Sequence, residues 1–265
     1  MFAMLPFALL IGCGVDKTTP VISNPTLPLV TGNWQIQSST GAPNAGILLV
    51  GSLTAAGTQV AGVLRFTDLA SANTCGPAQQ PLQFTGTIDL SQNISLTATT
   101  ASGAVVTVNL LMDAGPNAFG YGTLLVTGES CNYPLSRALG ANIAMVAGTF
   151  NGSVSAVGSL QSQYTGLGTL TLNLIQSTQP LADGQYSVSG TFQFSSGTCN
   201  DSGNVTGLLS GASFSLSSTS NDMQATGGID NTADQLSNVS TVFSAGLCST
   251  TIPAYDTYSG SLTKN

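Results

Sequence analysis

Apolar and polar residues alternate with a period of two along much of the chain. Leu82, Phe84, Gly86, Ile88 and Leu90 share one face, and the residues between them are Gln, Thr and Asp. A short turn at residues 91–93 leads into a second alternating run at residues 94–99. This period places one set of side chains in a core and the other toward solvent. The two runs therefore predict an antiparallel β-hairpin.

The same alternation returns at residues 106–112, 170–174 and 186–194, and turn residues recur roughly every ten to fifteen positions. No alternation of strands with helical patterns is present, so the sequence predicts an all-β chain. Glycines interrupt the apolar face in mid-strand at Gly62, Gly86, Gly190 and Gly207. Glycine permits the tight bending that a coiled sheet needs. We therefore expect antiparallel meander β-barrels, with β-sandwiches as the alternative.

The pattern runs twice. Residues 60–66 and 188–194 both read V-x-G-x-[LF]-x-F, and each precedes a cysteine. Thr85-Gly86 then matches Thr206-Gly207, and further pairs follow in the same order. An ordered set of matches indicates an internal duplication. We expect two β domains, at residues 31–137 and 143–265, with residues 134–144 as a connection that holds a short helical turn.

The first twelve residues form an apolar stretch that is too short to span a bilayer and is typical of a signal peptide. They end in Leu10-Ile11-Gly12-Cys13, which resembles the lipobox of bacterial lipoproteins. The resemblance implies that Cys13 carries the lipid and that the membrane is a partner through this anchor. Residues 13–30 then form a Pro-rich tether. Gly14 stands where an inner-membrane retention signal has Asp, so we expect an outer-membrane location in the cell envelope.

Four cysteines remain after Cys13, namely Cys75, Cys131, Cys199 and Cys248. An even number in an exported chain indicates disulfides, although spacing alone leaves three connectivities open. A duplicated unit keeps its bridge within itself. The repeat therefore predicts Cys75–Cys131 and Cys199–Cys248, each closing a loop of about fifty residues.

Composition narrows the function classes. Charged residues make up 6% of the chain, Lys and Arg together number four, and the net charge is −7. Four scattered basic residues cannot form a nucleic-acid footprint. The chain has no His, which excludes a Ser-His-Asp triad. No phosphate-binding or dinucleotide motif is present, so we expect no cofactor.

The sequence neighbours of the acidic residues indicate turns and not catalytic or metal-binding sites. Most of the Asp residues, among them Asp113, Asp183, Asp201 and Asp222, have turn-like neighbours. The segment from Asp230 to Asp234 lacks the spacing and the terminal Glu of a calcium loop. We therefore expect no metal site and no catalytic residues, and we interpret the chain as not being an enzyme. An enzyme would need carboxylates that converge.

Gly32-Asn33-Trp34 resembles the G-x-W motif that opens the first strand of calycins, in which the Trp plugs the closed end of a barrel. Two functions follow from these observations. The first is an envelope protein of non-enzymatic binding, adhesion or structural role, with a protein as its partner. The alternative is a calycin-like carrier of a small apolar ligand inside one barrel. Phe66, Phe84, Phe192 and Phe194 decide between them, since a carrier needs a hollow interior.

Overall fold

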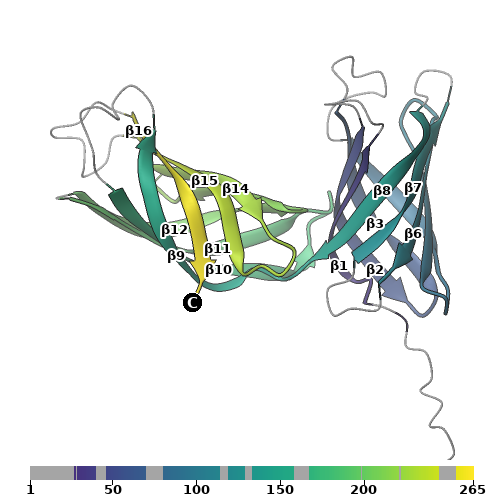
Figure 1. Cartoon of the computed structure of the whole chain (residues 1–265), viewed down its shortest axis with the longest axis horizontal. Coiled ribbons are helices and arrows are strands. Elements are labelled where there is room, and N and C mark those ends of the chain that lie inside the picture. Colours follow the sequence, from purple (N-terminus) through teal and green to yellow (C-terminus); the bar gives the residue numbers. More distant parts are fainter. Residues whose placement is uncertain are drawn as a thin grey trace, which may run out of the picture.

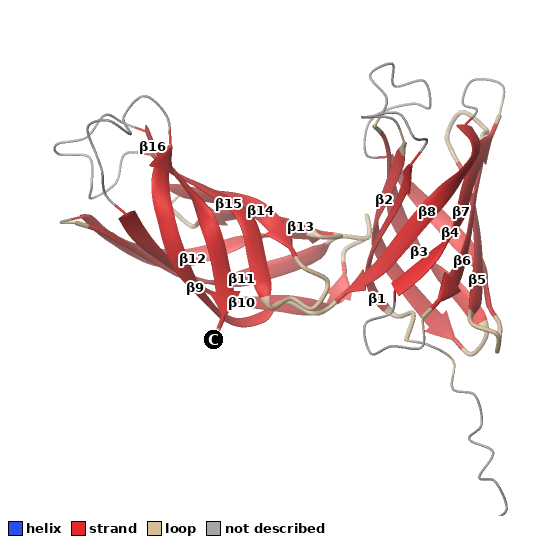
Figure 2. Ribbon diagram, in the orientation of Figure 1, coloured by secondary structure: helices blue, strands red, loops and turns tan. Residues whose placement is uncertain are grey.

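The computed structural model describes residues 27, 29–39, 46–69, 80–113, 119–128, 133–157, 167–197, 199–220, 222–244 and 255–265. These residues form two closed antiparallel β-barrels of eight strands each (Figures 1 and 2). Within the described ranges no helix is long and apolar enough to cross a bilayer. The predicted pair of tandem meander barrels is confirmed.

Barrel 1 is a meander in which each strand pairs with the next one and β8 closes on β1. Its strands are β1 (Gly32–Ser39), β2 (Ile47–Ala56), β3 (Gln59–Asp68), β4 (Gln80–Ile88), β5 (Asn93–Thr99), β6 (Val105–Met112), β7 (Phe119–Thr127) and β8 (Tyr133–Ile143).

Barrel 2 repeats this order, and β16 closes on β9. Its strands are β9 (Ala147–Val157), β10 (Leu167–Pro180), β11 (Tyr186–Ser196), β12 (Cys199–Ser210), β13 (Ser213–Ser218), β14 (Met223–Ile229), β15 (Gln235–Ser244) and β16 (Tyr255–Lys264).

The registers of the two barrels confirm the internal repeat. In barrel 1, Val60 pairs with Gly86, which pairs with Leu96. In barrel 2, Val188 pairs with Gly207, which pairs in turn with Leu216. The residues matched in the sequence therefore occupy equivalent places in β3–β5 and in β11–β13.

The mid-strand glycines allow the walls to coil. A Cβ atom built on Gly86 would lie 1.8 Å from the carbonyl oxygen of Ser95, and one on Gly207 would lie 1.9 Å from that of Ser215. No side chain fits at such a separation. The close approach of neighbouring backbones at these places therefore requires glycine, as the pattern predicted.

Two sequence-based expectations need correction. Residues 134–144 do not form a helical connection, because β8 occupies Tyr133–Ile143 and supplies the closing strand of barrel 1. The first barrel thus extends beyond residue 137, and residues 144–146 join the barrels. Leu90 lies in the turn after β4 and is exposed, so it does not share the buried face of Leu82 and Phe84.

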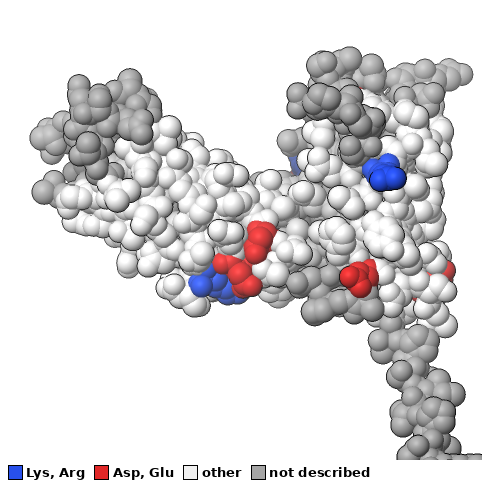
Figure 3. All heavy atoms as spheres, viewed as in Figure 1, with Lys and Arg blue, Asp and Glu red and all other residues white. Residues whose placement is uncertain are grey.

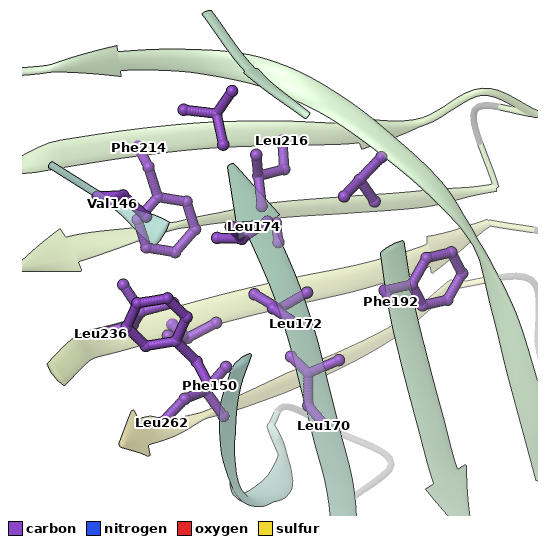
Figure 4. Packing of buried hydrophobic residues seen from close by; sticks show 14 of the residues in the cluster. Val146, Phe150, Leu170, Leu172, Leu174, Phe192, Phe214, Leu216, Leu236 and Leu262 are labelled. Atoms are coloured by element: carbon purple, nitrogen blue, oxygen red, sulfur yellow. The ribbon is translucent and has the colours of Figure 1, made fainter. Parts of the chain in front are cut away.

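Each barrel has its own apolar core. Inward residues of β1–β8 form one cluster and inward residues of β9–β16 form another. In barrel 2, Phe150, Leu172 and Phe214 come from three strands and point into the same interior (Figure 4). The outward positions are mainly Ser, Thr, Asn and Gln, so few charges mark the surface (Figure 3).

Barrel 2 meets the wall of barrel 1 with one of its ends, and the two barrel axes cross at a large angle (Figure 1). The end that makes this contact carries the β10–β11, β12–β13 and β14–β15 turns. This arrangement brings residues that are more than a hundred positions apart into contact.

Candidate functional site

Side chains occupy the interior of barrel 1. Trp34, Phe66 and Phe84 are among its largest fully buried side chains. The indole Nε1–H of Trp34 donates a hydrogen bond to the carbonyl oxygen of Val30 at 2.5 Å. Val30 is itself buried, and Leu27 packs against the same cluster. The segment before β1 therefore folds over this part of the core and satisfies the buried indole.

Aromatic rings pack against one another inside barrel 2. The ring of Phe194 lies 4.5 Å from that of Phe243 and 4.7 Å from that of Tyr258, measured between centroids. Phe192 approaches Phe243 at 6.3 Å. Separations of this size are typical of aromatic pairs in cores. The four Phe residues that were to decide between a solid and a hollow barrel are all buried in the two cores.

Two hollows of ligand size lie on the outside of the barrels. One of about 370 Å³ lies at the junction between the barrels and is lined by residues that include Asn142, Ile143, Met145 and Tyr186. Burial raises the pKa of the Tyr186 hydroxyl above its ordinary value of 10.0, which keeps it neutral. A second hollow, of about 620 Å³, lies on the outer wall of barrel 1 along β1, β7 and β8.

A reciprocal pair of hydrogen bonds joins the two barrels. The side-chain amide of Asn33 on β1 donates from Nδ2 to the carbonyl oxygen of Gly211 at 2.8 Å. Its Oδ1 accepts the Gly211 N–H at 3.0 Å. Next to it, Gln35 Oε1 accepts the N–H of Ala212 at 3.0 Å. Asn33 is buried, so these bonds hold the β12–β13 turn against β1 away from solvent.

An ion pair holds a second turn. Arg65 on β3 donates from a terminal guanidinium nitrogen to Asp183 Oδ2 at 2.7 Å. Asp183 belongs to the β10–β11 turn, where its Oδ1 also accepts the Gln185 N–H. Gly184 in this turn has φ +84°, and a Cβ there would lie 2.2 Å from the carbonyl oxygen of Val63. The turn therefore touches the backbone of barrel 1 at a place that excludes a side chain.

The acidic residues are dispersed. Asp89 accepts hydrogen bonds from the side chain and backbone of Asn93 across the β4–β5 turn. These bonds, the side-chain one first, lower its pKa below 3.8. Asp201 lies within β12 and not in the turn that its neighbours suggested. Among the described residues, no three acidic or Cys side chains gather as metal ligands.

Asp230 closes the β14–β15 turn. Its carboxylate accepts hydrogen bonds from the Thr232 hydroxyl at 2.6 Å and from the Asp234 and Gln235 N–H groups at 2.9 and 3.0 Å. Desolvation acts to raise the pKa of Asp230, but these hydrogen bonds outweigh it and the pKa falls below 3.8. All these donors come from its own turn, so the carboxylate has a structural role.

The predicted lipidation and disulfide sites fall largely outside the described residues. These are Cys13, Cys75, Cys131, Cys248 and the side chain of Cys199, whose backbone begins β12. The described flanks of one predicted bridge do meet. The Tyr133 hydroxyl at the start of β8 donates a hydrogen bond to Asp68 at the end of β3. A described residue before Cys75 is therefore in contact with a described residue after Cys131.

Comparison with known proteins gives no identification. No protein family, no curated protein and no solved structure matches the chain. The inter-barrel residues Asn33, Gln35 and Arg65 were not predicted, because on a strand they resemble any solvent-facing polar side chain.

Proposed function

We propose that this chain is a lipid-anchored protein of the bacterial cell envelope that acts by contact with a partner and not by catalysis or carriage. The observation that carries the proposal is the packing of both interiors. Phe66 and Phe84 are buried in one barrel, and Phe192 and Phe194 are buried in the other. A filled barrel leaves its outer walls and loops as the surfaces available for function.

Carriage inside a barrel is the alternative that this packing disfavours. Ligand sites need a cavity of at least about 300 Å³ lined by apolar side chains. The positions suited to line one instead hold aromatic rings in mutual contact, such as Phe194 and Phe243. Titration of the protein with a fluorescent apolar probe tests this point. Saturable one-to-one binding that Phe194→Trp abolishes would favour carriage.

The anchor rests on Leu10-Ile11-Gly12-Cys13 and on the Pro-rich residues that follow. Several acyl chains on one residue would hold the protein stably at a membrane, where one chain alone is marginal. An outer-membrane location is part of the same proposal, because Gly14 follows the cysteine.

Mass spectrometry of the mature N-terminus tests the anchor. The expected result is a chain that begins at an acylated Cys13, and loss of the protein from the membrane fraction in the variant Cys13→Ala. The matched control is Cys75→Ala, which leaves the lipobox intact and should stay in the membrane fraction. An unmodified N-terminus at another residue would refute the anchor.

A further inference from the structure

An apolar patch lies on the outer wall of barrel 1, where most outward positions are polar. Leu111 on β6, Tyr121 on β7 and Leu139 on β8 pair directly across the three strands. Their side chains are 38%, 56% and 56% exposed. Phe119 is also exposed one row further along β7. We call these four residues the barrel 1 patch. Contiguous apolar surface of this kind is typical of an interaction site.

The duplication provides an internal control for this patch. The corresponding strands of barrel 2 begin with β14 and β15. Gly228 pairs with Ser213 there as Leu111 pairs with Asn93, and Gly228 pairs in turn with Ser237 as Leu111 pairs with Tyr121. Neither of these partly exposed positions carries an apolar side chain. The fold of a barrel therefore does not require an apolar outer row on these strands.

Opposite charges stand at two corners of the patch. Asp113 directly follows β6, and its N–H donates to the carbonyl oxygen of Phe119 at 2.7 Å. Arg137 lies on β8, where it pairs with Thr123. Both side chains are exposed, and no ion pair within the described part of the chain involves either one. By strand spacing and rise they lie roughly 16 Å apart, on opposite sides of Tyr121.

The line that joins Asp113 to Arg137 across Tyr121 is compatible with a two-fold axis between two copies of the chain. A two-fold axis that lies in the contact plane over Tyr121, perpendicular to this line, superposes Asp113 of one copy on Arg137 of the other. By symmetry the second such pair forms as well. The same axis stacks Tyr121 on its own copy at the centre. The patch is therefore complementary to itself in both charge and polarity.

A hollow beside the barrel 1 patch is large enough to receive a side chain of the same patch on a second copy. The hollow of about 620 Å³ runs beside Leu139 and is lined by Gln37, Arg137 and Phe119, among others. The two-fold axis places Phe119 of one copy over this hollow on the other. The hollow also reaches Gln35, which already binds the turn of barrel 2. The patch is thus continuous with a surface that the chain uses for contact with itself.

We propose that two copies of this chain form a two-fold dimer through the barrel 1 patch, with Tyr121 at the axis and two Asp113–Arg137 ion pairs at its corners. β6 and β7 lie on the side of barrel 1 farther from barrel 2, so barrel 2 leaves this wall open (Figure 1). Since only one barrel carries the patch, the association closes at two copies and does not propagate.

Sedimentation equilibrium of the full chain in density-matched detergent tests the dimer. The expected result is a concentration-dependent equilibrium between one and two copies. Leu139→Ser should raise the dimer dissociation constant at least ten-fold, because the substitution occurs twice in each dimer. Leu167→Ser is the matched control, since Leu167 is an exposed leucine of barrel 2. It should leave the dissociation constant unchanged.

Charge reversal tests the predicted pairing. Arg137→Asp and Asp113→Arg should each weaken the dimer, because each places like charges opposite one another. The double variant should restore it to within about three-fold of the original. Restoration cannot arise within one copy, because the two side chains lie too far apart there for direct contact.

Three results would overturn the proposal. They are a single copy at every concentration up to about 100 μM, a dimer that Leu139→Ser does not weaken, and a double charge reversal that fails to restore association. Far-UV circular dichroism of each variant checks that the barrels still fold. A dimer insensitive to all three substitutions would place the contact on another surface.

Discussion

Asn33 and Gly211, which are 178 residues apart, exchange two hydrogen bonds and so join the wall of barrel 1 to a turn at the end of barrel 2. The amide side chain of Asn33 mimics the backbone of a neighbouring strand, because it offers one donor and one acceptor to a peptide group. Because the N–H and C=O of Gly211 both bond to this one side chain, the β12–β13 turn is fixed in orientation as well as in position. We infer that the barrels move as one unit.

Asn33→Ala should weaken this contact by about 1–3 kcal/mol, since it leaves the N–H and C=O of Gly211 without partners in a buried place. Hydrogen exchange at the amides of Gly211 and Ala212 should become faster. Asn109→Ala is the control, because Asn109 is exposed on barrel 1 and its side chain accepts a hydrogen bond from the Ser95 hydroxyl, far from Gly211 in the sequence and on another strand than Asn33. Unchanged exchange at Gly211 in the Asn33 variant would contradict a locked interface.

Gly86→Ala should destabilise barrel 1 by about 2–4 kcal/mol, because the added Cβ would lie 1.8 Å from a backbone oxygen. Trp34 is the single tryptophan and is buried in barrel 1, so its fluorescence during urea unfolding reports this barrel. Gly207→Ala should leave the Trp34 transition nearly unchanged and shift the circular-dichroism transition of barrel 2.

Gly103→Ala serves as the control for this pair. Gly103 has φ +85°, but a Cβ there would meet no atom within 4 Å. Its cost should therefore be limited to about 1 kcal/mol of backbone strain. Equal losses for Gly86→Ala and Gly103→Ala would show that the close approach of strands does not decide stability.

Stability of barrel 2 should fall at acid pH. Hydrogen bonds hold the pKa of Asp230 below 3.8, so its charged form is favoured in the folded state. This contribution is present above pH 3.8 and is lost as pH falls through the folded-state pKa. In Asp230→Asn, the urea midpoint of barrel 2 should depend less on pH between 5 and 2. An unchanged dependence would assign the effect to other groups.

Cys75–Cys131 and Cys199–Cys248 remain predictions, and non-reducing peptide mapping tests them. Each bridge should contribute roughly 4 kcal/mol by the chain-entropy argument, so reduction should lower both unfolding midpoints. The hydrogen bond between Tyr133 and Asp68 supports the first pairing, because it joins the flanks of the two segments. A Cys75–Cys199 cross-link would contradict the model of two self-contained barrels.

The sequence predicted what depends on local periodicity. Alternation placed Leu82, Phe84 and Ile88 on the buried face, and the repeat matched Gly86 with Gly207. The prediction failed at Leu90. Apolar and polar residues still alternate there in the sequence, but the strand has already ended in a turn, so Leu90 is exposed. The prediction also failed at residues 134–144, because Pro134 lies near the start of β8, beside a register shift in its pairing with β7, and does not end the strand.

Contacts between the barrels lay beyond prediction for a different reason. Arg65 and Asp183 sit on an outer face and in a turn, where charged side chains are normally solvated. Their pairing depends on how one closed barrel rests on another, which no local pattern records. The asymmetry between the two walls became clear only from the registers, which place Leu111 and Tyr121 where barrel 2 has Gly228 and Ser237.

Closure of both barrels has a consequence for a protein with few charges. Strands rich in Thr, Val and Leu with little charge are the kind of segment that grows into cross-β fibrils when an unpaired backbone is offered. In each barrel the first and last strands pair with one another, at β1–β8 and at β9–β16. The described barrel walls therefore present no unpaired backbone as a template, and such growth would first require a pair of neighbouring strands to separate.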